Sequence, residues 1–354
     1  MGEILGLGIT HYPGLTVQNS LVGRFNATLK DPGLPDHLRD PKNWHPTMRE
    51  QWGDDEGLGH SESHRQAMIE RFRIARQELD AFQPDFVLIF GDDQYENFKE
   101  DIVPPFAILA YDQVEAQPWL HNSRGKNWWN EPDDQKFLIN GHRKAGKYLA
   151  TSLLTDGFEV AYAYKPLHAK GLGHAFLNSI LYLDFDRKGF PYPVVPFSVN
   201  SYGRWLIGAH GAPMMPSEAA AIFADEDELA PPPPQPWRCF QIGASIARAA
   251  AASPWKVAII ASSSWSHSFL TAKNSLLFPD VESDKRYYEA LCAGDWDTWR
   301  NTTIEEAESR GHHELLNWFC LAGAMAELDR KPTEAVFMES WISNSNKTFA
   351  VFRP

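Results

Sequence analysis

A short apolar run followed at once by polar side chains constrains the fold more than any other stretch. Residues 86–90 read Phe-Val-Leu-Ile-Phe, with Pro84 before them and Gly91 after them. This length and composition, bounded by turn residues, predict a buried strand. Side chains able to handle metals or protons follow it directly: Asp92, Asp93, Gln94, Glu96 and Asn97. Ligands of open α/β sheets bind where strands run out, so we interpret this end as a candidate site, against the alternative of an ordinary polar turn.

Other segments extend the pattern into an α/β fold. Apolar, β-branched runs predict strands over 4–9, within 102–110, and over 159–164, 193–199 and 256–261. Helical spacing of apolar residues predicts helices over 61–82, about 136–155, 175–183, 239–252 and 305–328. We therefore expect one α/β domain over residues 1–354, with a central sheet flanked by helices and no internal repeat.

Residues 19–60 contain many Pro, Gly, Asp, Asn and Trp residues. A stretch of this composition and length is typical of a long functional loop, and we expect it to be irregular. Together with the helix that follows, it forms an insertion at about 19–80 that we expect to cap the site. The tryptophans within 44–52 and 118–129 are predicted to form part of a substrate lid.

Composition excludes some functions and locations. The formal net charge of -13 argues against a nucleic-acid or anionic-membrane partner. No apolar run approaches the length that spans a bilayer, and the N-terminus lacks the basic start of a signal peptide. Three widely spaced cysteines, Cys239, Cys292 and Cys320, fit buried thiols in a reducing compartment. We expect a cytoplasmic protein.

Histidines recur where predicted strands and loops end. His11 follows the first predicted strand, and His267 follows the strand over 256–261. His174 follows a glycine at the start of a helix, and Glu314 lies within the helix expected over 305–328, just before its apolar face. Each of these histidines alone is also typical of a loop or capping residue. Parallel strands would bring His11 and Gln94 to the same edge of the sheet.

Four separate pieces of the chain resemble one known family. They are Gly-Ile-Thr-His-Tyr-Pro at 8–13, Gly-Asp-Asp-Gln-Tyr-Glu-Asn-Phe at 91–98 with Pro-Pro-Phe-Ala at 104–107, Ser-Trp-Ser-His at 264–267, and Gly-His-His-Glu-Leu-Leu-Asn-Trp at 311–318. In this order they resemble the class III extradiol ring-cleavage dioxygenases, the superfamily of the protocatechuate 4,5-dioxygenase catalytic subunit. The resemblance runs from residue 5 to about 335. It implies a central mixed sheet flanked by helices.

The resemblance also implies non-haem Fe(II) and oxygen-dependent extradiol cleavage of a catechol-like or aminophenol-like aromatic with O2. By motif, His11 and Glu314 correspond to two of the three iron ligands, whereas Gln94 stands where the second histidine is expected. An amide oxygen is a neutral donor that does not match imidazole for Fe(II). Three explanations stay open: Gln94 binds iron through its oxygen, His60 or His64 supplies the nitrogen, or the site is inactive.

Other positions carry roles implied by the same resemblance. His267 matches the acid–base histidine, and an ordinary imidazole pKa of roughly 6.5 would suit proton transfer in both directions. His174 matches a histidine of the substrate pocket. Asp93 is expected to orient residue 94 or a ligand histidine, or to cap the following segment. Asn200 and Tyr202, at another strand end, are expected to contact substrate.

Two histidines beside Glu314, His312 and His313, are expected to be exposed or to support the ligands from behind. A homodimer or higher oligomer is implied by the family. Two other functions stay open: a catalytically silent subunit that has lost its iron site, and a non-oxidative metal-dependent enzyme on the same fold. The chain has no Gly-x-Ser-x-Gly elbow of a serine hydrolase and no dinucleotide fingerprint after its first strand.

Overall fold

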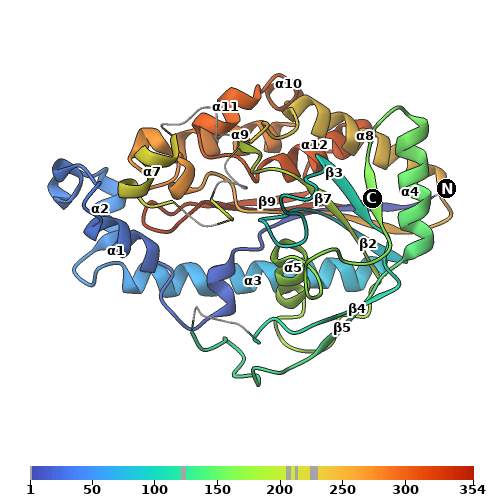
Figure 1. Ribbon diagram of the computed structural model, residues 1–354, viewed down its shortest axis with the longest axis horizontal. Helices are drawn as coiled ribbons and strands as arrows, with labels where there is room; N and C mark the ends of the chain where they lie inside the picture. Colours follow the sequence, from blue (N-terminus) through green and yellow to red (C-terminus); the bar gives the residue numbers. More distant parts are fainter. Residues whose placement is uncertain (1, 121–124, 205–208, 212–213, 224–229) are drawn as a thin grey trace.

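The computed structural model describes residues 2–120, 125–204, 209–211, 214–223 and 230–354, and its centre is one mixed eight-stranded sheet (Figure 1). The strand order is β6-β3-β7-β2-β8-β1-β10-β9. The strands are β1 Ile4–Ile9, β2 Phe86–Asp92, β3 Phe106–Leu109, β6 Ala161–Ala163, β7 Val194–Val199, β8 Val257–Ser262, β9 Glu334–Met338 and β10 Lys347–Phe352. The mixed α/β fold expected from the sequence is confirmed.

The four central strands are parallel, which brings their carboxyl ends to one edge. β8 pairs in parallel with β1 and β2, and β2 pairs in parallel with β7. Ile9 lies opposite Ser262, and Asp92 lies opposite Val199. The residues that follow these strands therefore meet at one edge, as the sequence pattern predicted. β10 and β9 extend the sheet on one side by antiparallel pairing, and β3 pairs antiparallel with β7 on the other.

Helices cover both faces of the sheet (Figure 1). One face packs against α4 Arg143–Thr155, α8 Pro236–Ala252, α9 Val281–Ala293, α10 Trp296–Arg300, α11 Ile304–Ser309 and α12 Leu316–Glu327. The other packs against α3 Leu58–Phe82 and α5 His174–Leu183. Glycines let α8 and α12 touch, because a Cβ on Gly243 would lie 1.8 Å from the Cys320 carbonyl oxygen. Within the described ranges, no helix combines the length and apolar character needed to cross a bilayer.

The single helix expected over 305–328 is wrong. The structure has α11 and α12 there, separated by a turn in which Gly311 adopts a left-handed φ of 70°. A Cβ on Gly311 would also lie 2.7 Å from the His267 carbonyl oxygen, so only glycine fits this close approach. Glu314 consequently stands in the turn before α12, beside His267, and not on a helix.

The start of another expected helix also differs. The helix expected from about 136 begins at Arg143, because Phe137–Asn140 forms strand β5. This strand pairs antiparallel with β4, Gln113–Ala116, in a separate two-stranded sheet. The apolar residues at 137–139 fit both periodicities over so short a run, and the pairing with β4 decides between them.

The 19–60 segment is not irregular throughout. It contains two helices, α1 Gly23–Lys30 and α2 Pro46–Trp52. Outside this segment, the structure also has a helix α7, Pro216–Phe223. Phe25 packs 5.4 Å from the ring of Trp44 and 5.3 Å from that of Trp52, so these two tryptophans belong to a small core of their own. The rest of the insertion is mostly α3, which lies along the sheet and contributes to the main core.

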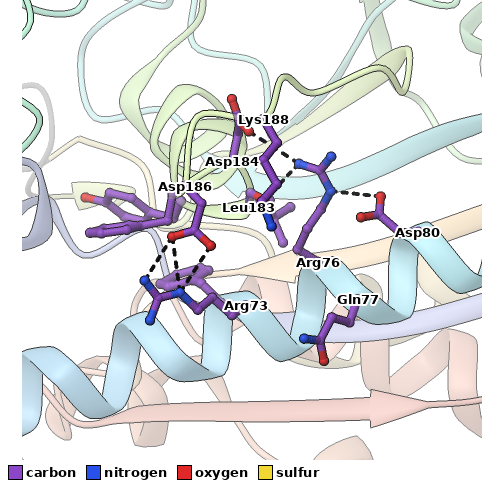
Figure 2. A pocket seen from close by; sticks show the side chains of 11 residues that line it. Arg73, Arg76, Gln77, Asp80, Leu183, Asp184, Asp186 and Lys188 are labelled. Carbon is purple, nitrogen blue, oxygen red and sulfur yellow. Dashed lines mark hydrogen bonds and ion pairs between the residues drawn. The ribbon is translucent and has the colours of Figure 1, made fainter.

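A cluster of ion pairs fastens α3 to the loop that follows α5 (Figure 2). The Arg73 guanidinium lies 2.9 Å from a carboxylate oxygen of Asp186, and the Arg76 guanidinium lies 2.8 Å from one of Asp80 and 3.5 Å from one of Asp184. Arg73 and Asp186 are exposed to 44% and 36%. Solvent screens this pair, so it contributes about 1 kcal/mol at most.

Candidate metal centre and adjoining pocket

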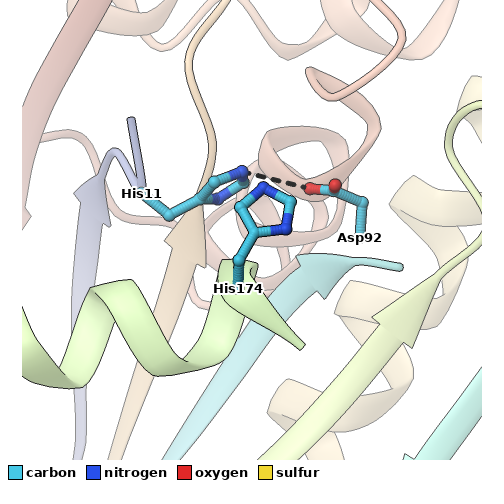
Figure 3. Close-up of side chains that lie close together, drawn as sticks. All are labelled: His11, Asp92 and His174. Atoms are coloured by element: carbon cyan, nitrogen blue, oxygen red, sulfur yellow. Dashed lines mark ion pairs between the residues drawn. The ribbon is translucent and has the colours of Figure 1, made fainter. Parts of the chain in front are cut away.

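His11, Asp92 and His174 lie together at the carboxyl edge of the sheet (Figure 3). One ligand atom from each falls within 4.8 Å of the other two. Asp92 is the last residue of β2, His11 lies just beyond β1, and His174 is the first residue of α5. Segments distant in sequence thus supply a group of side chains able to hold a metal ion.

The ring of His11 is oriented for coordination. Its Nδ1 donates to the Ser262 carbonyl oxygen at 2.9 Å, which leaves the lone pair on Nε2. Nε2 lies 3.4 Å from Glu314 Oε2 and 3.6 Å from Asp92 Oδ1. Burial, with His174 nearby, holds the pKa of His11 well below its ordinary value, so the ring is neutral.

The two carboxylates are buried with oxygens unpaired. Glu314 Oε1 accepts from the Tyr202 hydroxyl at 2.5 Å, but Oε2 has no hydrogen-bond partner within the described part of the chain. Asp92 Oδ1 accepts from Asn317 at 3.1 Å, and its Oδ2 likewise lacks a partner there. Burial raises the pKa of Asp92 to about 6, and burial together with Asp92 raises the pKa of Glu314. A bound cation would relieve this repulsion.

His174 is held by a carboxylate at the mouth of the group. Its Nδ1 lies 2.9 Å from Glu96 Oε2, and its ring meets that of His11 edge-on at 4.9 Å. Burial alone would lower the pKa of His174, but Glu96, Asp92 and Glu314 outweigh it and raise the pKa to about 9. A metal ligand must be deprotonated, so this proton would have to leave before Nε2 could coordinate.

The distances fit a metal ion. Two donors bound at about 2.1 Å and at right angles lie about 3 Å apart, close to the 3.4 and 3.6 Å between His11 Nε2 and the carboxylate oxygens. Imidazole and carboxylate donors with open positions suit non-haem Fe(II). The unpaired oxygens of Asp92 and Glu314 are the observation that a cation accounts for.

A pocket of about 920 Å³ opens above this group. Its walls include His174, Tyr202, His267 and Glu314, with Arg24 farther out. His11 and Asp92 are buried and do not line the pocket, whereas Glu314, which lies 3.4 Å from His11 Nε2, and His174 do. The pocket is large enough for a substituted aromatic ring.

His267 lies at the pocket wall beside Glu314. Its Nε2 is 3.3 Å from Glu314 Oε1, and its backbone N–H donates to the Gly311 carbonyl oxygen at 2.9 Å. The unperturbed pKa expected from the sequence is wrong: burial, with Lys347 and His313 nearby, lowers the pKa of His267 to about 3. The imidazole is therefore neutral at physiological pH, the form that accepts a proton.

Residues 228–350 match the family model described as the catalytic LigB subunit of aromatic ring-opening dioxygenase. Over this C-terminal segment the chain is similar to the LigB family. The matched range includes β8, His267, Glu314 and the first residues of β10, whereas His11, Asp92 and His174 lie outside it. The resemblance to the class III extradiol dioxygenases is confirmed.

Curated relatives agree with this assignment. Three are named 2,3-dihydroxyphenylpropionate/2,3-dihydroxicinnamic acid 1,2-dioxygenase. The one from Burkholderia vietnamiensis is 25% identical over 73% of this chain and 81% of its own. The one from a Rhodococcus species is 24% identical over 79% and 89%. The one from Paraburkholderia phymatum is 27% identical over 57% and 49%. An enzyme with "2" appended to that name, from Pseudomonas putida, is 27% identical over 40% of each chain. The last two matches therefore span half of the relative or less.

Gln94 and Asp93 directly follow Asp92 in sequence, but their side chains make different contacts. Gln94 lines the pocket, and its amide nitrogen donates to the Gly211 carbonyl oxygen at 2.6 Å. Asp93 accepts from the backbone N–H groups of residues 96, 97 and 98, so its carboxylate caps this turn. Asp93 thus adopts the capping alternative, and the role of Gln94 stays a prediction.

The alternative histidines lie apart. His60 Nε2 is 2.9 Å from Ser340 Oγ, and its ring stacks on His64 at 5.5 Å. Neither belongs to the group that Asp92 forms with its two histidines, as far as the described residues show. Tyr202 reaches the centre through Glu314, whereas the contact observed for Asn200 is a backbone bond to the Pro105 carbonyl oxygen.

Of the two alternatives for His312 and His313, exposure is wrong, and a supporting position behind the ligands stays a prediction. The two histidines are 0% and 2% exposed, because the turn before α12 is packed beneath the sheet edge. The tryptophan lid is only partly present: Trp119 lines the pocket, while Trp128 packs against Arg65. Residues 121–124 of that segment lie outside the described residues.

Sequence reasoning missed Asp92 as a member of the candidate metal-binding group. Asp92 stood in the polar stretch after the predicted strand, but the strand continues through it, and this places its side chain beside His11. The apolar run predicted the strand but not where the strand ends. Because side chains alternate between the two faces of a strand, the residue at which the strand ends decides which aspartate faces the centre. Asn317 donates a hydrogen bond to Asp92, and no sequence pattern predicted this contact.

Proposed function

We propose that this protein is an extradiol dioxygenase that binds non-haem Fe(II) through His11, Asp92 and Glu314, with His174 at the open side. The proposal rests on one observation above all: a neutral His11 Nε2 faces two buried carboxylates with unpaired oxygens, beneath an open pocket. The LigB match and the relatives support it. Bound Fe(II) supplies a site where an aromatic diol or aminophenol and O2 meet and exchange electrons.

The protein's own side chains then have distinct tasks. His267 Nε2, at the pocket wall, accepts the proton that the substrate hydroxyl loses on binding and returns it to the product, a role that requires its pKa to rise from about 3 when substrate is bound. Tyr202 holds Glu314 Oε1 and so aims Oε2 at the metal position. The overall reaction takes up one O2, both of whose atoms enter the ring-opened product, so no other oxidant is needed.

The pocket supports a substrate with an acidic substituent. The Arg24 guanidinium lies 5.4 Å from the ring centre of Phe269, which is itself 5.3 Å from the ring of His267. Arg24 donates to the Met214 carbonyl oxygen, but its Nε is unpaired and it forms no ion pair with a described carboxylate. Burial lowers the pKa of Arg24 to about 10, which keeps it charged. A half-buried cation that forms no ion pair within the described residues, with Glu218 and Asp31 only acting on it electrostatically, is suited to bind a carboxylate.

An oxygen electrode tests the reaction. The Fe(II)-loaded protein is expected to consume one O2 per molecule of 3-(2,3-dihydroxyphenyl)propionate and to form a coloured ring-opened product. A Glu314→Ala variant, which keeps the pocket but removes the carboxylate, is expected to consume none. Turnover that persists under nitrogen would favour the non-oxidative enzyme instead. Absence of iron binding and of turnover would favour the silent subunit.

A pair of substrates tests Arg24. With Arg24→Met, kcat/KM for the propionate is expected to fall at least about 10-fold, since a charge-assisted hydrogen bond is lost. For 3-propylcatechol, which has the same length but no charge, we expect a change of less than about 3-fold. Equal losses with both substrates would show that Arg24 serves packing and not recognition.

A further inference from the structure

A buried polar network lies directly behind the pair formed by His267 and Glu314. Its centre is Asp284, in the first turn of α9, whose side chain is 0% exposed. We propose that Asp284 is a positioning residue that sets His267 relative to Glu314. This inference rests on the proposed function for its catalytic consequence, but not for its geometry.

Four donors converge on the carboxylate of Asp284. Ser266 donates from its backbone N–H at 3.1 Å and from its hydroxyl at 2.5 Å. His312 Nε2 lies 2.7 Å from Oδ1, and the Asn346 amide lies 2.7 Å from Oδ2. Both oxygens are thus fully engaged, an arrangement that suits the ionised carboxylate.

Each donor stands next to the site in sequence. Ser266 precedes His267, and His312 lies two residues before Glu314. Asn346 lies two residues after Asn344, which lines the pocket. The single carboxylate therefore ties together three segments that carry pocket side chains.

Backbone contacts transmit this restraint. The His267 N–H donates to the Gly311 carbonyl oxygen, and the Trp265 N–H donates to the Asn346 carbonyl oxygen at 3.0 Å. Loss of one bond to Asp284 would let the 264–267 segment and the turn at 311–314 shift against each other. Misplacement of an acid–base group by about 1 Å can cost about 100-fold in rate.

Substitutions at His312 test the inference without touching the pocket. Gln places an amide N–H near the position of His312 Nε2, whereas Leu of similar size offers no donor. For His312→Leu we expect kcat to fall about 10-fold with KM changed less than about 2-fold, and for His312→Gln a recovery to within about 3-fold of the parent.

Tyr287→Phe is the matched control. Its hydroxyl bonds to Thr302 at 2.6 Å, and its ring packs edge-on against His312 at 5.2 Å. The variant loses a buried hydrogen bond at the same depth, so we expect its Tm to fall about as far as that of His312→Leu, with kcat unchanged. Unchanged kcat in His312→Leu, or equal losses in the Gln and Leu variants, would overturn the inference.

A crystal structure of His312→Leu separates the two proposals. The positioning role predicts that His267 Nε2 and Glu314 Oε1, 3.3 Å apart here, move apart by at least about 0.5 Å. An unaltered separation would overturn it, whether or not the parent consumes O2. A parent that consumes no O2 would overturn the proposed function alone.

Discussion

Two charged clusters of this protein differ in how far they are buried and in whether their carboxylates are paired. On the surface, Arg73 and Arg76 each find carboxylates at hydrogen-bonding distance (Figure 2). At the sheet edge, His11 and His174 meet Asp92 in a buried group where carboxylate oxygens stay unpaired (Figure 3). The first cluster is complete within the protein. The second is costly to bury unless a cation joins it.

The comparison separates stability from function. Exposed ion pairs hold α3 to its neighbour at little cost and with little gain, and any residue of the right charge serves. The buried group sets Asp92 beside Glu314, and burial together with this like-charge neighbour raises the pKa of Glu314, although protonated His174 offsets part of the repulsion. The burial of this group in a fully packed environment is the feature that indicates a metal ion and a catalytic role.

Removing a carboxylate from each cluster should give the largest contrast. We expect Glu314→Ala to lower kcat at least about 100-fold, since even partners that only support metal ligands cost 10- to 100-fold. We expect Asp186→Asn, in the surface cluster, to change kcat less than about 2-fold. Steady-state O2 uptake with the same substrate measures both. Similar activities in the two variants would erase the functional distinction between the clusters.

Asp92→Asn should act in opposite directions on metal binding and on stability. Fe(II) affinity is expected to fall about 10- to 100-fold. Because the pKa of Asp92 is raised to about 6 in the fold, its ionised form destabilises the metal-free protein above that pH. The metal-free variant should therefore be more stable at pH 7.5, by roughly 1 to 3 kcal/mol. Urea unfolding with and without Fe(II) measures both effects, and a less stable metal-free variant would contradict the like-charge account.

Lys347 extends the comparison to a buried cation. Burial lowers its pKa to about 7, and its Nζ lies 4.0 Å from the ring of Tyr12, with Ser343 Oγ at 3.1 Å. Between pH 7 and about 10.5 the unfolded chain binds one more proton than the folded chain, so this residue makes stability rise with pH. Lys347→Met should be more stable than the parent at pH 7, with the gap narrowing by about 1 kcal/mol per pH unit. A gap that stays constant from pH 7 to 9.5 would show that the lysine does not titrate in this range.

The smallest effect is expected on the surface. Arg73→Met should change the free energy of unfolding by less than about 1 kcal/mol, because its ion pair with Asp186 is exposed and screened. Urea unfolding in 0.05 and 0.5 M NaCl tests this, since a screened pair weakens further with salt. If the free energy of unfolding falls by more than about 2 kcal/mol, the surface cluster contributes more to stability than an exposed ion pair does.

The sequence predicted the architecture and much of the centre, for a physical reason. Parallel strands bring their carboxyl ends to one edge, so strand patterns alone placed His11, His267 and the polar stretch after β2 together. What it missed depends on local backbone geometry. The left-handed Gly311 breaks the predicted late helix and turns Glu314 inward, and the length of β2 selects Asp92 for the centre.

Long-range hydrogen bonds also could not be predicted from the sequence. The bond from Tyr202 to Glu314 and the convergence of donors on Asp284 join residues that no periodicity relates. The pKa of His267 depends on burial that only the packed structure reveals. Gln94 is the reverse case, because the sequence raised the question of its role and the structure leaves it as a hypothesis for experiment.

Anaerobic Fe(II) titration of the parent, Gln94→Ala and Glu314→Ala tests the central claim most directly. The buried group predicts one tightly bound Fe(II) per chain in the parent, an affinity within about 3-fold of it in Gln94→Ala, and loss of tight binding in Glu314→Ala. If the parent binds no iron, or if Gln94→Ala abolishes binding while Glu314→Ala retains it, the assignment of the metal centre to His11, Asp92 and Glu314 is wrong.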